Sequence, residues 1–154
     1  MAIAKTHECH NDLIGLLVDS ENTTTPGASA ETGPFETLRE AYIFAAAIGF
    51  AIGEPAADGV ATSKGKTIKQ EVFENADGAI EVRSLAALLG PPPPLAEERL
   101  EDRLQAVAAD DQAPAYATLD RYARTGFDWL QDRRQDEPDI RGLILSAIEE
   151  LGRV

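Results

Sequence analysis

The chain is poor in cysteine, tryptophan and methionine, with one of each among its 154 residues. The single cysteine, Cys9, excludes an intramolecular disulfide and is typical of a reducing compartment. Long hydrophobic runs are also absent: the longest covers residues 41–53, whereas a membrane helix needs about 20 apolar residues. No apolar segment follows Lys5 as a signal peptide would require. We therefore expect a cytoplasmic protein.

Positive charge is scarce as well, because 14 basic residues stand against 27 acidic ones and the net charge is −13. A field of this sign repels a polyanion, so it disfavours a protein that binds DNA by neutralising phosphates. It permits docking on a basic protein surface, and it also keeps a small protein soluble. The length and the ordinary globular composition predict one domain that needs neither a disulfide nor a metal to fold.

Apolar residues recur at helical spacing along most of the chain, which predicts a mainly α fold of about five or six helices with little or no sheet. Thr37-Leu38-Arg39-Glu40 matches a capping box and predicts a helix that runs to about Ile52. Further helices are expected over residues 11–20, 79–89, 95–109, 113–134 and, behind Pro138, up to residue 151. The apolar face expected for the last helix consists of Ile140, Leu143, Ile144, Ala147, Ile148 and Leu151.

Residues 67–75 have two interpretations. Thr67 and Gln70 could form a second capping box that opens a short helix, but the β-branched residues make a short strand the alternative. Residues 1–33 are expected to be an N-terminal segment and, from Glu21, a flexible linker, with the helical domain over residues 34–154. The prolines at 91–94 predict an extended polyproline stretch between two helices.

The motifs that could carry chemistry do not meet their requirements. The stretch from Gly59 to Thr67 ends like a phosphate-binding loop, but one residue too many separates Gly59 from Gly65 and no apolar strand precedes it. His7, Cys9 and His10 are metal-ligand types, yet a zinc site usually draws on two separated pairs and the chain offers no second one. Paired carboxylates lie on polar helix faces. We therefore predict no enzyme, no metal and no cofactor.

Two residues near the end of the 113–134 helix interrupt its pattern. Gly126 carries a helix-propensity cost, which indicates a close helix contact, a kink or the approach of a partner. Gly49, in the first long helix, indicates close backbone packing or the start of the helix end. Trp129 lies on a different face from Phe127 and is predicted to anchor an interface. The candidate interaction residues are Trp129, Lys64, Lys66, Lys69, Arg121 and Arg124.

Three segments resemble one small bacterial family, the accessory proteins of Dnd DNA phosphorothioation operons called Dnd system-associated protein 4. They are Pro34–Gly49, Ile68–Asn75 and Tyr122–Leu130, and the order and spacing agree from about residue 33 onward. The chain departs from the family pattern after Gly49, where acidic residues replace expected basic ones, and at Thr125, where a glycine is expected. The signature residues, which we expect to serve packing, are Phe35, Thr37, Phe44, Ala45, Ala46, Gly49, Phe73, Tyr122, Ala123 and Gly126.

The resemblance implies a setting in bacterial defence linked to sulfur-modified DNA, and it brings no catalytic residues with it. The leading hypothesis is a non-enzymatic accessory protein that docks on a larger protein partner from the same operon. One alternative is a DNA-contacting regulator that uses Lys64, Lys66, Lys69 and the basic residues between Arg121 and Arg134. Another is a helical module that assembles with copies of itself.

Overall fold

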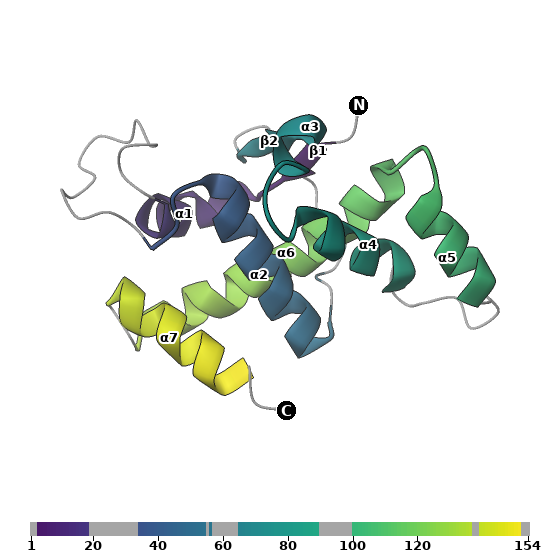
Figure 1. Ribbon diagram of the computed structural model, residues 1–154. Helices are drawn as coiled ribbons and strands as arrows, with labels where there is room; N and C mark the ends of the chain where they lie inside the picture. The colour runs from purple at the N-terminus through teal and green to yellow at the C-terminus, as the bar shows by residue number, and fades with distance from the viewer. Residues whose placement is uncertain are drawn as a thin grey trace.

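Two long helices, α2 (Leu38–Ile52) and α6 (Ala113–Arg134), cross at the centre of the molecule (Figure 1). The structure is a computed structural model, and it describes residues 3–18, 34–54, 56, 65–89, 100–136 and 139–151. Lys64, the expected linker, the polyproline stretch and most of the loop that resembles a phosphate-binding loop lie outside these ranges.

The remaining elements surround this crossing. In chain order they are β1 (Ile3–Lys5), the 3-10 helix η1 (Glu8–His10), α1 (Asn11–Leu17), β2 (Thr67–Lys69), α3 (Gln70–Phe73), α4 (Ala79–Leu89), α5 (Leu100–Ala108) and α7 (Ile140–Leu151). The prediction of a mainly α fold is confirmed. The described residues form seven α-helices, one more than the upper count expected, and α3 among them is a single turn.

The helix α2 begins and ends as its sequence predicts. The Thr37 side chain accepts a hydrogen bond from the Glu40 backbone N–H at 3.3 Å. The Glu40 carboxylate accepts from the backbone N–H of Glu36 at 3.0 Å, one residue before the capping position. At the other end Gly53 adopts φ 83° and donates its N–H to the Gly49 carbonyl, which closes the last turn.

Residues 67–75 contain both a strand and a helix. Ile3, Ala4 and Lys5 pair antiparallel with Lys69, Ile68 and Thr67, and α3 follows directly. The second capping box is therefore wrong: Lys69 is the N-cap of α3 and makes no side-chain cap. The reason is long-range, because pairing with β1 holds Thr67 in an extended strand.

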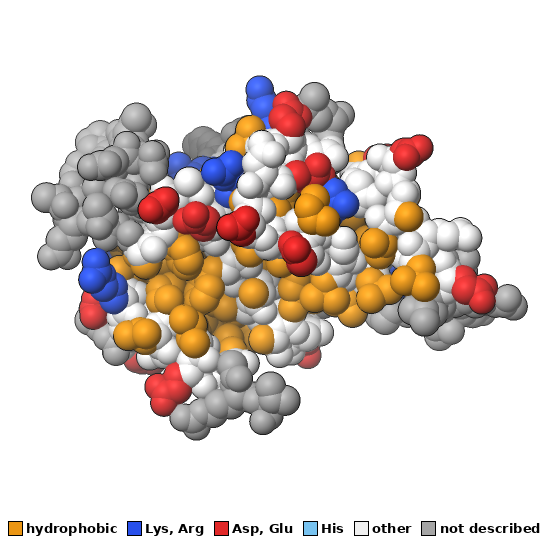
Figure 2. Space-filling view, viewed as in Figure 1, with side chains coloured by type: hydrophobic (Ala, Val, Ile, Leu, Met, Phe, Trp, Pro, Cys, Tyr) orange, Lys and Arg blue, Asp and Glu red, His pale blue; other side chains and the backbone are white. Residues whose placement is uncertain are grey.

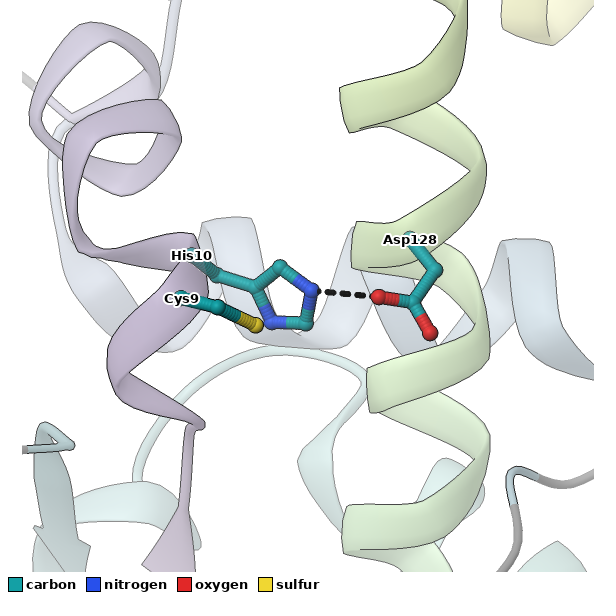
Figure 3. A group of neighbouring side chains, drawn as sticks. All are labelled: Cys9, His10 and Asp128. Carbon is teal, nitrogen blue, oxygen red and sulfur yellow. Dashed lines mark hydrogen bonds and ion pairs between the residues drawn. The ribbon is translucent and has the colours of Figure 1, made fainter. Parts of the chain in front are cut away.

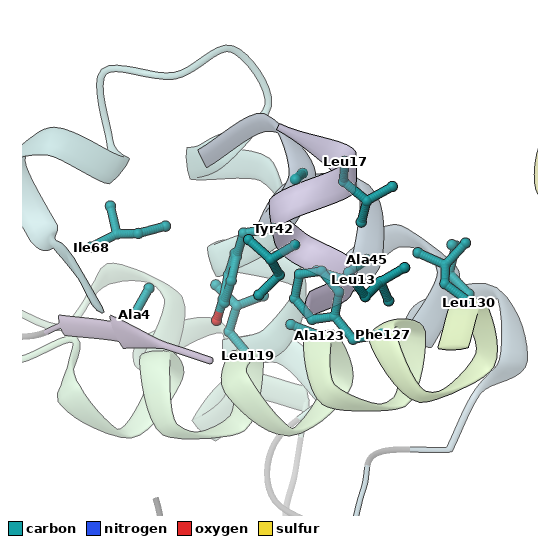
Figure 4. Close-up of a cluster of buried hydrophobic side chains, with 14 of the residues drawn as sticks. Ala4, Leu13, Leu17, Tyr42, Ala45, Ile68, Leu119, Ala123, Phe127 and Leu130 are labelled. Atoms are coloured by element: carbon teal, nitrogen blue, oxygen red, sulfur yellow. The ribbon is translucent and has the colours of Figure 1, made fainter. Parts of the chain in front are cut away.

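The core lies where α1, α2 and α6 meet, and β1 and β2 close one end of it (Figure 4). Phe73 reaches it from α3 and packs edge-on against Tyr42 and Tyr116, with ring centroids 5.5 and 5.7 Å apart. Ala4, Leu13 and Leu17 are fully buried in the same core. The core thus takes side chains from both sides of the boundary expected at residue 34.

Candidate functional site

Hydrophobic side chains gather in a band across one face of the molecule, over α7 and α2 and onward to α4 and α5 (Figure 2). Acidic side chains lie along one edge of this band. We call it the apolar band. The large hydrophobic side chains exposed on α4, α5 and α7 are Ile80, Leu85, Leu89, Leu104, Leu145 and Ile148. A contiguous apolar surface of this kind is typical of a protein interaction site, whereas single exposed leucines are ordinary.

The helix α7 carries the two most exposed large hydrophobic side chains of the described residues. Leu143 and Ala147 turn toward the core and are buried. Leu145 is 66% exposed and Ile148 is 55% exposed, and their spacing of three places them side by side on the helix surface. The apolar face expected for this helix is therefore only partly buried. Leu104 on α5 is likewise 53% exposed.

Sequence reasoning missed this surface although a signal was present. Leu145 lies outside the face assigned to the last helix, so α7 carries apolar residues around more of its circumference than one core-facing stripe needs. Such an excess indicates a second apolar contact, either inside the fold or with a partner.

Trp129 lies half-buried against the core. The Arg133 guanidinium stacks on its ring at 4.8 Å from the centroid. Arg133 also donates two hydrogen bonds to the Glu150 carboxylate, at 2.8 and 2.6 Å, and so joins α6 to α7. A partner-anchoring role for Trp129 stays a prediction.

The described basic candidates are spread over different parts of the fold. Lys66 comes directly before β2, and Lys69 is its last residue. The strand β2 pairs with β1, and Lys5 of β1 is hydrogen-bonded to Asp120 of α6. Arg121 donates from Nε to the Ala56 carbonyl at 2.8 Å and holds the chain after α2. Arg124 is half-buried on the same helix. Trp129 follows Asp120 by about two and a half turns, so it projects from the opposite side of α6 to the β2 lysines.

Asp120 is the most perturbed carboxyl group among the described residues. Its Oδ1 accepts from the Lys5 backbone N–H at 2.9 Å and from the Tyr42 hydroxyl at 2.5 Å. Burial raises the pKa of Asp120 from 3.8 to about 7, and these two hydrogen bonds oppose the rise. Burial, followed by the charge of Asp120, also raises the pKa of Tyr42. The pair ties β1, α2 and α6 together.

Glu74 joins α3, α4 and α6 in a second polar cluster. Its Oε1 accepts from Tyr116 and Gln70, each at 3.1 Å, and forms an ion pair with Arg83. Burial, together with the Glu74 charge, raises the pKa of the Tyr116 hydroxyl. These three donors converge on one oxygen of Glu74, so the cluster holds α3, α4 and α6 together.

The signature residues lie in the core or at its edges. Ala45, Ala46, Phe73, Tyr122 and Ala123 are buried, and Phe35 and Phe44 pack on the core with ring centroids 5.3 Å apart. Thr37 caps α2, and Gly49 and Gly126 lie at the crossing of α2 and α6.

The family model for DNA sulphur modification system-associated protein 4 matches residues 10–151 of this chain. The chain belongs to this family. Comparisons with curated proteins and with solved structures found no match. The family description associates its members with DNA sulphur modification systems. No helix among the described residues has both the length and the apolar character to cross a membrane.

Proposed function

We propose that this protein is a non-enzymatic accessory component of a DNA sulphur modification system that docks on a larger protein of the same system. The apolar band is the observation that carries the proposal. Its helices α4, α5 and α7 leave large hydrophobic side chains in water, a cost that is recovered when a partner covers them. Family membership supports the choice of partner.

The charge of the chain favours one chemistry for that partner. With a net charge of −13 and acidic side chains along the edge of the apolar band, the complementary surface is an apolar ridge flanked by lysine and arginine. Leu145 and Ile148 are the two most exposed large hydrophobic side chains of the described residues, and we take them as the anchors.

Co-purification from the native host tests the proposal. Tagged wild-type protein is expected to recover products of the sulphur modification operon, and Leu145→Asp with Ile148→Asp is expected to lose them. Ser146→Asp, which adds a charge on the same helix without removing an apolar contact, is the matched control. Circular dichroism confirms that all variants fold. Full recovery of the operon proteins by the folded double variant would contradict the docking surface.

Two further measurements separate the alternatives. Concentration-dependent mass in light scattering, abolished by the same double variant, would assign the apolar band to a second copy of the chain. A low-salt gel shift on modified or unmodified DNA would instead support a DNA-contacting regulator. Unchanged phage resistance after deletion of the gene, with no operon protein recovered, would overturn the accessory role altogether.

A further inference from the structure

Three side chains with metal-ligating atoms meet between η1 and α6 (Figure 3). Cys9 and His10 come from η1, and Asp128 comes from α6, 118 residues after His10 in the chain. One ligand atom from each lies within 4.8 Å of the others. His10 Nε2 and Asp128 Oδ1 are 2.7 Å apart. This cluster is separate from the apolar band and does not depend on the docking proposal.

The His10 ring is held firmly and has one nitrogen unused. Its side chain is 0% exposed, and Phe127 packs against it with ring centroids 5.5 Å apart. Asp128 as acceptor places the ring proton on Nε2, so Nδ1 carries a lone pair. Nδ1 is buried and has no hydrogen-bond partner within the described residues. Buried polar atoms in native proteins are nearly always satisfied, so this nitrogen has the capacity to accept from a water or to bind a metal ion.

The arrangement matches the way in which proteins prepare a histidine for a metal ion. A ligating imidazole almost always donates its other ring N–H to a carboxylate or carbonyl, which fixes the tautomer and strengthens the ligand. In Figure 3 the Cys9 thiol lies at the ring edge that faces away from Asp128. Zinc bonds of about 2.3 Å to sulfur and about 2.0 Å to nitrogen at a tetrahedral angle place two such atoms about 3.6 Å apart.

We propose that Cys9 Sγ and His10 Nδ1 bind a zinc ion, with Asp128 as the residue that positions His10. The neighbouring His7 Nδ1 lies 3.0 Å from the Cys9 sulfur but accepts from the Cys9 backbone N–H at 3.2 Å, so it would join the site only if that hydrogen bond is given up. Cys9 is exposed, so the ion enters from the surface. Thiolate with imidazole is a donor set that selects zinc over magnesium or calcium. The remaining coordination position is taken by water or by a partner side chain.

Zinc binding to the purified full chain, freed of its affinity tag and of metal by a chelator, tests the site. Competition with a chromogenic zinc indicator is expected to give one equivalent bound at micromolar or lower concentration. Because Cys9 is the only cysteine, alkylation followed by mass measurement reports on it alone, and zinc is expected to protect it. Cobalt is expected to give a thiolate-to-metal charge-transfer absorption that Cys9→Ser removes.

Variants distinguish ligand from positioning residue. Cys9→Ser is expected to abolish stoichiometric binding, and Asp128→Asn to weaken it by about 10- to 100-fold. Asp136→Asn, an exposed carboxylate just after α6, is the matched control and keeps wild-type affinity. Circular dichroism without metal verifies the fold of each variant. Absence of stoichiometric zinc, or binding that survives in Cys9→Ser, overturns the site, and unchanged affinity in Asp128→Asn overturns the positioning role.

Discussion

Gly126 of α6 lies directly against the backbone of Ala45 in α2, so that a Cβ atom at position 126 would stand 1.7 Å from the Ala45 carbonyl oxygen. The contact is reciprocal one turn along each helix. A Cβ atom at Gly49 would stand 2.0 Å from the Tyr122 carbonyl oxygen. The two central helices therefore touch through their backbones, and only glycine fits at either position.

Replacement of either crossing glycine by alanine is expected to destabilise the fold strongly. Gly126→Ala must push α2 and α6 apart, since the obstructing atoms are backbone, and we expect a loss of about 3 kcal/mol in the free energy of unfolding. Gly15→Ala is the matched control: that glycine lies within α1, nothing stands within 4 Å of its added Cβ, and a gain of up to about 1 kcal/mol is expected. Urea denaturation measures both. If Gly126→Ala leaves the free energy of unfolding as high as Gly15→Ala does, the backbone contact is contradicted.

Loss of the Thr37 cap is expected to lower the free energy of unfolding less than Gly126→Ala does, because it affects only the N-terminal end of α2. Thr37→Ala removes the acceptor for the Glu40 N–H, and we expect a destabilisation of about 1 kcal/mol. Thr37→Ser keeps a hydroxyl at the same position and is expected to retain most of the stability. Denaturation of the three proteins in parallel tests the prediction, and equal stability of the alanine and serine variants would show that the cap contributes nothing.

Asp120 is expected to make stability depend on pH in an unusual direction for a carboxyl group. Its pKa is about 7 in the folded protein against an ordinary value of 3.8. The protonated form therefore stabilises the fold fully below about pH 4, and this contribution is lost as the pH rises to about 7. Asp120→Asn stays neutral and can still accept from Lys5 and Tyr42. We expect its stability relative to wild type to rise by roughly 4 kcal/mol between pH 4 and pH 8.

The measurement for Asp120 is the difference between two denaturation series, so the titration of other groups cancels. Asp110→Asn, at an exposed carboxyl group, is the control and is expected to give a nearly flat difference. A flat difference for Asp120→Asn as well would contradict the raised pKa.

The pair between Arg133 and Glu150 is expected to contribute little despite its two hydrogen bonds. Both side chains are 46% exposed, so water and salt screen their attraction. A double-mutant cycle with Arg133→Gln and Glu150→Gln is expected to give a coupling energy of about 0.5–1 kcal/mol that falls in 1 M salt. A coupling that is unchanged by salt would contradict a mainly electrostatic contribution and would assign the coupling to the two hydrogen bonds themselves.

Local sequence patterns determined the helices, the cap at Thr37 and the family. Helical periodicity located α4 and α6 at their observed bounds. These features could be predicted because each depends on residues within a few positions of one another, where backbone geometry alone sets the neighbours.

Only the tertiary structure decided how distant segments meet. The sequence left three explanations for Gly126, and the crossing of α2 and α6 selects a backbone contact. Nothing local pairs residues 3–5 with 67–69 or places Asp128 on His10. The exposure of Ile148 likewise depends on which side of α7 the core covers. Such relations follow from the packing of whole helices, and a pattern read along one segment does not contain the position of another.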